Sequence, residues 1–368
     1  MTKEFEKTSI SVRLTRNSSI ELLRIISMIM ITFHHFAYHG GFEWAENELT
    51  IPHYWYNFIV MGGKIGVDIF VLISGYFLIN DKDSLFNFKR ILKFWGQVFF
   101  YSIAIYLLFG ILGTSEISIK SLIKECFPIT FGSWWFASTY FVLYLIHPFL
   151  NKLLDALDKK MYQAFLVMIV TCWSIIPTVT EQECEGNGLL WFITLYAIAA
   201  YARKFEFNKR YSAKHFFIVG VIFSILIYLS SVTFHSTYFY GQNKLPILVV
   251  SVSLFMAFAS LKIKYNKWIN VIASATFGVY LIHDNKMIRP FLWLKIFKNY
   301  QYQHTNRIIL YSIIVVAIVY VVCTIIDLLR QMIFEKPYMW VVNKYSQTWL
   351  RPFERLFELC KVLVFGKE

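Results

Sequence analysis

The first long apolar stretch of the chain contains a cation and an imidazole whose spacing suits chemistry. Arg24 and His35 are eleven residues apart, which on an α-helix is three turns plus about 20°, so both side chains share one face about 16 Å apart. A guanidinium binds anions, and a near-neutral imidazole accepts protons. Glu21 lies one turn before Arg24 and can pair with it. The same residues also fit a structural Glu–Arg pair and an interfacial histidine.

A second apolar stretch carries a lysine and an aspartate at helical spacing. Lys64 and Asp68 are four residues apart and can neutralise each other on one helix face. The glycines around them permit close approach of a neighbouring helix. A purely structural role for this stretch and a role in a site are both compatible with the spacing.

The elements that position these residues are membrane helices. The chain has 368 residues, of which 57% are hydrophobic and 16% are charged, whereas soluble domains have about 25% charged residues. The composition predicts one all-α, polytopic bundle of about ten transmembrane helices. Their expected ranges are 18–38, 57–79, 91–112, 134–154, 161–178, 189–201, 215–235, 245–261, 268–283 and 308–328.

The net charge of +13 is concentrated in short loops between apolar stretches, which indicates membrane orientation rather than binding of nucleic acid. The positive-inside rule predicts a multi-pass protein of the plasma membrane with both termini in the cytoplasm. We expect a cytoplasmic segment at 1–17, the membrane domain at 18–330, and a cytoplasmic amphipathic tail at 331–368. The loop after the ninth helix breaks the rule, because Arg289 and its basic neighbours fall outside. Either the prediction of the ninth helix is wrong, or this loop folds back to serve a site.

The two stretches together resemble the acyltransferase 3 family of integral-membrane O-acyltransferases. That family pairs an arginine with a histidine on its first helix, matched by Arg24 and His35, and an acidic residue matching Glu21 often precedes the arginine. Its second helix reads roughly Gly-Val-Asp-x-Phe-Phe-x-x-Ser-Gly-Phe. The matching residues are Gly66, Val67, Asp68, Phe70, Ser74 and Gly75.

Two further stretches resemble the family more loosely. One opens the fourth predicted helix at Trp134 and Trp135 and continues through Tyr140, and the other ends the ninth at His283. The tryptophans also fit an interfacial aromatic belt, and His283 fits an interfacial histidine. The predicted topology places His35, Lys64, Trp134 and His283 toward the outer side and Arg24 toward the cytoplasm.

The resemblance implies an acyl-CoA donor, expected to be acetyl-CoA from the cytoplasm, and a sugar hydroxyl as acceptor on a surface glycan or lipid-linked oligosaccharide. Arg24 would bind the donor, and His35 would act as general base or carry the acyl group covalently. Asp68 would orient or charge-stabilise a histidine if the helices bring the two together. We expect Trp134, Trp135 and Tyr140 to contact substrate, together with Glu21, Lys64, Ser74 and His283. No metal site is expected, and the five isolated cysteines show no ligand spacing.

Two other classes share the helices, basic loops and buried charges. A transporter or flippase for a lipid-linked glycan would show inverted repeats with broken helices, and none is visible in the sequence. A glycan polymerase would carry a large outer loop with paired basic residues, of which the loop with Arg289 and Lys295 is a faint version. Release or transfer of label from acetyl-CoA separates the enzyme from the transporter.

Overall fold

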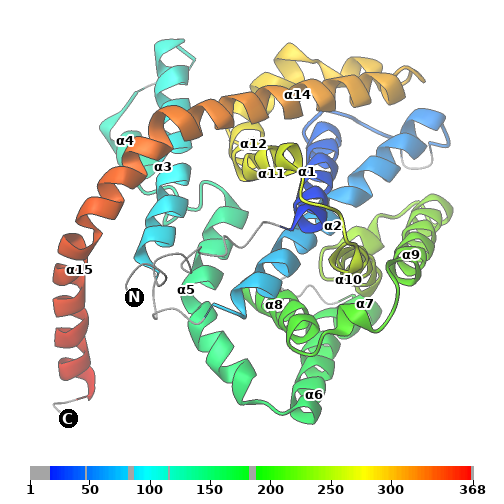
Figure 1. The fold of residues 1–368 in the computed structure, drawn as a ribbon. Helices are drawn as coiled ribbons and strands as arrows, with labels where there is room; N and C mark the ends of the chain where they lie inside the picture. The colour runs from blue at the N-terminus through cyan, green and yellow to red at the C-terminus, as the bar shows by residue number, and fades with distance from the viewer. Residues whose placement is uncertain (1–16, 46–47, 82–86, 115–116, 182–187, 366–368) are drawn as a thin grey trace, which may run out of the picture.

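The computed structural model describes residues 17–45, 48–81, 87–114, 117–181 and 188–365, and these residues form helices and connecting turns without a strand (Figure 1). The prediction of an all-α bundle is therefore confirmed. The α-helices of eight or more residues are α1 (Ser18–Tyr38), α2 (Ile51–Leu78), α3 (Phe88–Ile111), α4 (Ile119–Cys126), α5 (Trp135–Ala156), α6 (Lys159–Val170), α8 (Leu189–Lys204), α9 (Ala213–Thr233), α10 (Leu245–Ser260), α11 (Lys267–Ser274), α12 (Thr276–His283), α14 (Ile308–Arg330) and α15 (Lys336–Phe365).

All ten predicted stretches are helical, but they differ in length and character. Within the described residues, six helical segments are long and apolar enough to cross a membrane. They are Ser18–Tyr38, Ile51–Leu78, Phe88–Ile111, Lys159–Thr180, Ala213–Thr233 and Ile308–Ser346. The other four predicted crossings correspond to α5, α8, α10 and the pair α11–α12. Ten crossings therefore remain a prediction, whereas a multi-pass membrane bundle does not depend on that number.

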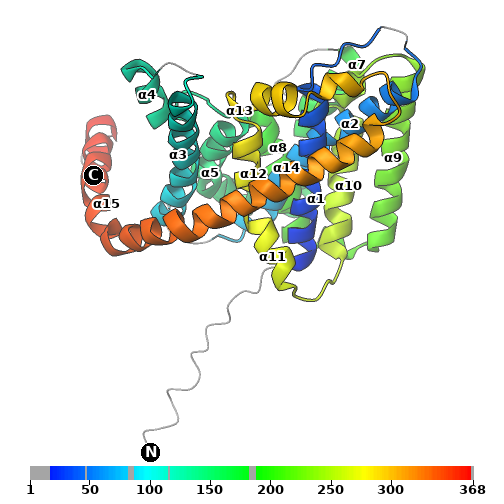
Figure 2. The same cartoon turned by 90° about the horizontal axis from the view of Figure 1, so that it is seen from above.

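Helix α1 occupies the centre of the bundle and packs against α2, α10, α11, α12 and α14 (Figures 1 and 2). Its closest neighbour is α2, and glycines make this approach possible. A Cβ atom at Gly63 would lie 2.2 Å from the His34 ring, and one at Gly66 would lie 2.6 Å from the Ser27 carbonyl oxygen. Any larger residue would force the two helices apart, so the expectation of glycine-mediated helix packing is confirmed.

The ninth predicted helix is broken into α11 and α12 at Ala275. At the break, Thr276 turns its hydroxyl back to the Ala273 carbonyl oxygen. One turn later Gly278 packs directly on the Asp327 carboxyl group of α14, where a Cβ would lie 2.1 Å from Cγ. These contacts seat the short α12 against α14, so that its last residue, His283, points at α1.

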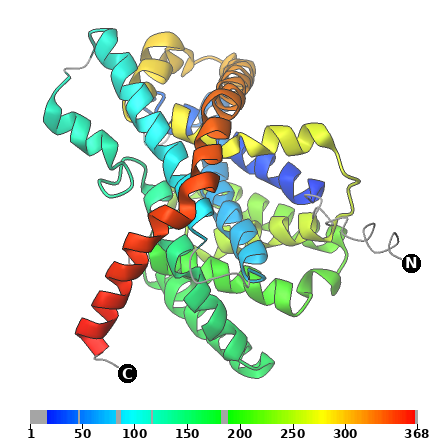
Figure 3. The ribbon, with the colours of Figure 1, turned by 60° about the vertical axis from the view of Figure 1, so that its left-hand side comes forward.

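The peripheral helices present apolar side chains outward, as a bundle in lipid requires. Only 17% of the most apolar 18-residue stretch of α9 is buried inside the protein, and the same share is buried in the segment Lys159–Thr180. Helices α3, α4 and α15 form one side of the molecule, where α15 continues from α14 through a π-helical turn and bends away (Figures 2 and 3). Residues 331–365 of the predicted tail are thus helical, residues 366–368 lie outside the described residues, and the place of the tail at a membrane surface stays a prediction.

Candidate active site

The imidazoles of His35 and His283 lie in contact although 248 residues separate them in the chain. His35 Nδ1 is 2.9 Å from His283 Nε2, and His283 Nδ1 is 2.6 Å from the Val279 carbonyl oxygen. The carbonyl can only accept, so the hydrogen bonds assign the proton of neutral His283 to Nδ1. His283 Nε2 then accepts from His35 Nδ1–H. His35 Nε2 is left with its lone pair, as a general base requires.

Asp284 and Arg289 complete this cluster. Asp284 is 3% exposed, and its Oδ1 lies 3.6 Å from His35 Nδ1, 3.7 Å from His39 Nε2 and 3.0 Å from Arg289 Nε. Arg289 also donates to the Asp284 carbonyl oxygen at 2.8 Å. Burial raises the pKa of Asp284 to about 7, and the Arg289 charge opposes that rise. A carboxylate here would stabilise positive charge on His35 while a proton resides on it.

His35 lies between two cavities and lines both of them. Ile31, Val67 and Trp135 also line both cavities. The first is polar, with a volume of about 300 Å³. Its other lining residues are His34, Tyr38, His39, Gly63, Lys64, Asp284 and Arg289. Hydrogen-bonding and cationic groups dominate this wall, so the cavity suits a polar substrate.

The second cavity is narrow and apolar, with a volume of about 30 Å³. Its other lining residues are Met28, Phe70, Phe136, Phe277 and Tyr280. Met28 lies two turns before His35 on α1, in the direction of Arg24. The imidazole therefore separates a polar space from an apolar one along the axis of α1.

Arg24 lies one turn beyond the apolar cavity and is not among the residues lining either space. Its Nη1 is 3.5 Å from Glu21 Oε2, and its side chain is 28% exposed. The buried Arg24 Nε has no hydrogen-bond partner among the described residues. Tyr140 lies near both Ser74 and Arg24. The predicted Glu21–Arg24 pair is thus present, with donor capacity left on the guanidinium.

Asp68 faces away from His35. Its carboxylate accepts hydrogen bonds from Trp191 Nε1 at 3.0 Å and Gln242 Nε2 at 2.9 Å, and Ser251 Oγ lies at 3.5 Å. These partners lie on α8, on α10 and just before α10, so Asp68 ties α2 to both helices. The helices do not bring Asp68 to a histidine in the described contacts, and Asp284 occupies the place next to His35 instead. Asp68 was expected to orient a histidine only if the helices bring the two residues together, and in this structure they do not.

The remaining predicted site residues separate into two groups. Trp135 lines both cavities, and Lys64 lies 5.5 Å from the Trp135 ring centroid, where a cation interacts with the aromatic face. Trp134, in contrast, is 1% exposed and lines neither cavity. It is a core residue in this structure rather than part of an exposed aromatic belt. Ser74 donates to the Phe70 carbonyl oxygen at 2.9 Å.

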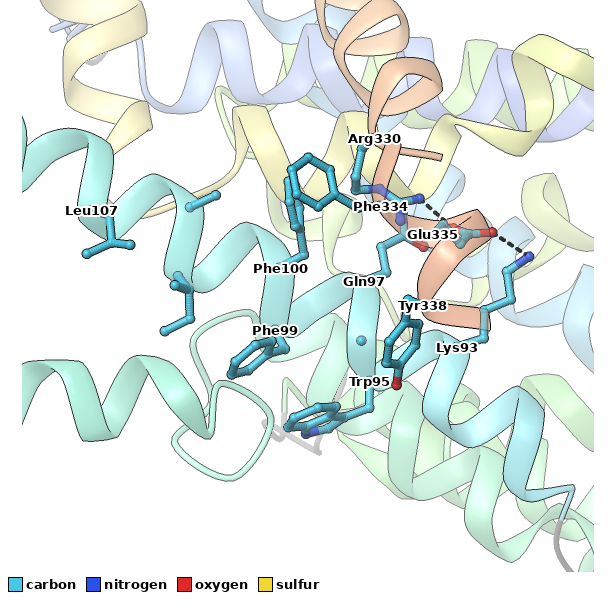
Figure 4. Close-up of a pocket in the computed structure, with 13 residues that line it drawn as sticks. Lys93, Trp95, Gln97, Phe99, Phe100, Leu107, Arg330, Phe334, Glu335 and Tyr338 are labelled. Atoms are coloured by element: carbon cyan, nitrogen blue, oxygen red, sulfur yellow. Dashed lines mark hydrogen bonds and ion pairs between the residues drawn. The ribbon is translucent and has the colours of Figure 1, made fainter. Parts of the chain in front are cut away.

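A larger cavity of about 420 Å³ lies elsewhere, between α3 and the bend that joins α14 to α15 (Figure 4). Phe99, Phe100 and Phe334 give it an apolar wall. One side is closed by ion pairs from Glu335 to Arg330 and Lys93, each at 2.8 Å. None of the predicted site residues lines this cavity. The volume of a cavity therefore does not by itself identify the candidate active site.

Sequence reasoning missed Asp284, Arg289 and His39 as members of the cluster. Asp284 directly follows the recognised histidine, and Arg289 belongs to the loop that breaks the positive-inside rule. The structure shows that this loop folds back to the site, which was one of the two explanations for the exception. The positive charge of a loop predicted to lie outside was therefore the sequence feature that could have identified Arg289 as a site residue.

His35, His39 and Asp284 also offer one ligand atom each within 4.8 Å of one another, a spacing that a metal ion could bridge. Arg289 already places a positive charge 3.0 Å from the same carboxylate oxygen. A guanidinium at that distance competes with a cation for the carboxylate and repels it. The cluster is satisfied by hydrogen bonds and ion pairs, and the expectation of a metal-free site stays a prediction.

The fold and site define a multi-pass membrane protein with a histidine pair between a polar and an apolar cavity. The family model described as an acyltransferase domain, acyltransferase 3, matches residues 17–327. The chain therefore belongs to this family of acyltransferases, and the resemblance drawn from its two motifs is confirmed.

Comparison with individual proteins gives a more limited likeness. The chain is 28% identical over 203 residues to the peptidoglycan O-acetyltransferase OatA of Listeria monocytogenes. That match covers 48% of this chain and 29% of the relative, so the chain matches less than a third of that protein's length. No solved structure matches the chain significantly.

Proposed function

We propose that this protein is a membrane O-acetyltransferase that transfers an acetyl group from cytoplasmic acetyl-CoA to a sugar hydroxyl of a cell-surface or exported glycan. The observation that carries the proposal is the position of His35 between the polar and apolar cavities. Its Nδ1 carries the proton, so its Nε2 keeps the lone pair that a general base needs. The relative named as a peptidoglycan O-acetyltransferase supports a glycan acceptor. Basic loops support a plasma-membrane protein with cytoplasmic termini.

In this proposal the acceptor occupies the polar cavity and the thioester approaches through the apolar one. His35 Nε2 takes the proton of the sugar hydroxyl as its oxygen attacks the thioester carbonyl carbon. The carbon–sulfur bond then breaks, and the proton moves from His35 to the departing thiolate. His283 holds the His35 ring, and Asp284 offsets its transient charge.

A covalent route uses the same groups. His35 Nε2 would attack the thioester carbonyl, the carbon–sulfur bond would break, and the thiolate would leave. The sugar oxygen would then take the acetyl group from the imidazole, and the proton of its hydroxyl would pass to the thiolate. Arg24 supports either route, because a guanidinium whose buried Nε–H has no partner among the described residues suits an anionic portion of the donor. Mass spectrometry of protein quenched during donor turnover, in the absence of acceptor, distinguishes the routes by an acetyl group on His35.

The test uses purified full-length protein and labelled acetyl-CoA with peptidoglycan fragments as acceptors. We expect acetyl ester formation by the unaltered protein and none above background by His35→Ala, with equal amounts of folded protein. His215→Ala is a matched control, because His215 is an exposed histidine at the start of α9. Normal transfer by His35→Ala contradicts both roles of His35. Movement of a glycan across vesicles without label transfer would favour the transporter instead.

A further inference from the structure

A second polar cavity of about 110 Å³ lies between the start of α2 and the end of α9, outside the cluster around His35. Its walls come from the segment joining α1 to α2, from α2, and from the turn after α9. The lining residues are Glu48, Leu49, His53, Tyr54, Asn57, Ser231, Val232, His235, Ser236 and Thr237. We call this space the α2–α9 cavity. Amide, imidazole and hydroxyl groups dominate its lining.

Asn57 is the main evidence that the α2–α9 cavity binds a ligand. Its residue surface is only 7% exposed, yet its side-chain amide makes no hydrogen bond to another described residue. The amide oxygen and nitrogen are not among the fully enclosed polar atoms that lack a partner, so they are open to the cavity. A polar ligand in the cavity would satisfy the amide as both donor and acceptor.

Two histidines add to this picture. His53 Nδ1 lies 2.7 Å from the Glu48 carbonyl oxygen, so it carries the proton and leaves Nε2 as an acceptor. The His53 ring stacks on Trp44 with centroids 4.8 Å apart, which holds its orientation. His235 has a φ of 49° and directly follows Phe234, the C-cap of α9, where a left-handed residue commonly ends a helix. This turn brings His235 into the lining of the α2–α9 cavity.

The α2–α9 cavity and the polar cavity at His35 are arranged along the same helix. Asn57 and Lys64 are seven residues apart on α2, which places them about 10 Å apart along the axis and about 20° apart around it. Both lie in the half of α2 that meets the end of α1 carrying His35. A chain-like acceptor whose reacting sugar lies beside Lys64 would extend a neighbouring sugar toward Asn57.

We propose that the α2–α9 cavity is a second glycan subsite, which binds a sugar unit of the acceptor removed from the one that reacts. This inference rests on the proposed function and specifies its substrate as a polymer of several sugars. Sugars carry hydroxyl groups that both donate and accept, which matches the amide of Asn57, Nε2 of His53 and the hydroxyl of Thr237. A single disaccharide engages only the cavity at His35, whereas a longer chain engages both.

The test measures binding of two peptidoglycan fragments to the purified full-length protein by titration calorimetry, one a single disaccharide and one of several disaccharides. We expect the longer fragment to bind more tightly. Asn57→Leu should weaken the longer fragment roughly three- to tenfold, as expected for one lost hydrogen bond, and leave the disaccharide unchanged. If Asn57 has only a structural role, Asn57→Leu should not weaken binding of the longer fragment, because leucine fills a similar volume and removes an unpaired amide.

His235→Gly provides a second variant that is independent of the first. Glycine relieves the left-handed strain, so the folded protein should be at least as stable, while affinity for the longer fragment falls. Ser230→Ala is the control, since Ser230 precedes a lining residue on α9 and lies outside the cavity. Equal affinities of both fragments, or loss of both together in Asn57→Leu, overturn the subsite. Binding is read without acetyl transfer, so failure of the proposed function appears separately as missing ester formation.

Discussion

His35 Nδ1 and His283 Nε2 lie 2.9 Å apart, and this contact determines which nitrogen of His35 is available for chemistry. The chain of donors begins at the Val279 carbonyl oxygen, which fixes His283, and His283 in turn fixes His35. A base held in one tautomer needs no reorganisation before it accepts a proton. The short helix α12 supplies both His283 and the carbonyl, so its seating on α14 matters for the site.

Replacement of His283 tests this relay. We expect His283→Leu to lower the acetyl transfer rate roughly a hundredfold or more, because His35 loses the acceptor that selects its tautomer. His283→Gln should retain more activity, since its amide oxygen can accept from His35 Nδ1. Initial rates with labelled acetyl-CoA compare the three proteins. A leucine variant as fast as the unaltered protein would exclude the relay.

Arg289 should influence the pH dependence of the reaction. Its charge lowers the pKa of Asp284 against the effect of burial, which raises that pKa to about 7. In Arg289→Gln the pKa of Asp284 therefore rises, and the carboxylate becomes protonated at a higher pH. The acidic limb of the pH–rate profile should move to higher pH.

Lys295→Gln is the control for this shift, because Lys295 is an exposed cation of the same loop. It removes the same charge without touching Asp284, so its pH–rate profile should match that of the unaltered protein. An acidic limb that stays in place in Arg289→Gln, or moves to lower pH, contradicts the assigned role of Arg289.

Arg24 should govern use of the donor. We expect Arg24→Gln to raise KM for acetyl-CoA roughly tenfold or more, because a charge-assisted contact to an anionic donor is lost. KM for the acceptor should change little, since Arg24 lies beyond the apolar cavity. Arg90→Gln removes a cation paired with Asp81 and serves as the control. Equal donor KM values in the two variants would remove Arg24 from donor binding.

Asp68 should act on stability rather than on chemistry. Asp68→Leu leaves the buried indole of Trp191 and the amide of Gln242 without their acceptor, which costs about 1–3 kcal/mol for each group. The melting temperature in detergent should fall clearly, and activity per folded molecule should stay close to that of the unaltered protein. Asp284→Asn should show the reverse pattern. Loss of specific activity in Asp68→Leu at unchanged melting temperature would return Asp68 to the catalytic group.

Local sequence determines much of the helical framework. The first predicted helix and α1 share the range Ser18–Tyr38, because hydropathy ends there and Asn17 caps its start by accepting from the Ser19 and Ile20 amides. The common face of Arg24 and His35 follows from helical periodicity alone. These features depend on residues within a few turns of one another, so they can be predicted from the chain itself.

Tertiary structure alone decided which acid lies beside His35. Asp68 carries the motif, but its rotation on α2 directs it to Trp191 and Gln242, whereas Asp284 reaches His35 because α12 breaks from α11 and packs on α14. Helical periodicity places a side chain on a face of its own helix, but it does not determine which helix covers that face. That choice depends on the packing of distant helices, and the cavities on either side of His35 exist only as its result.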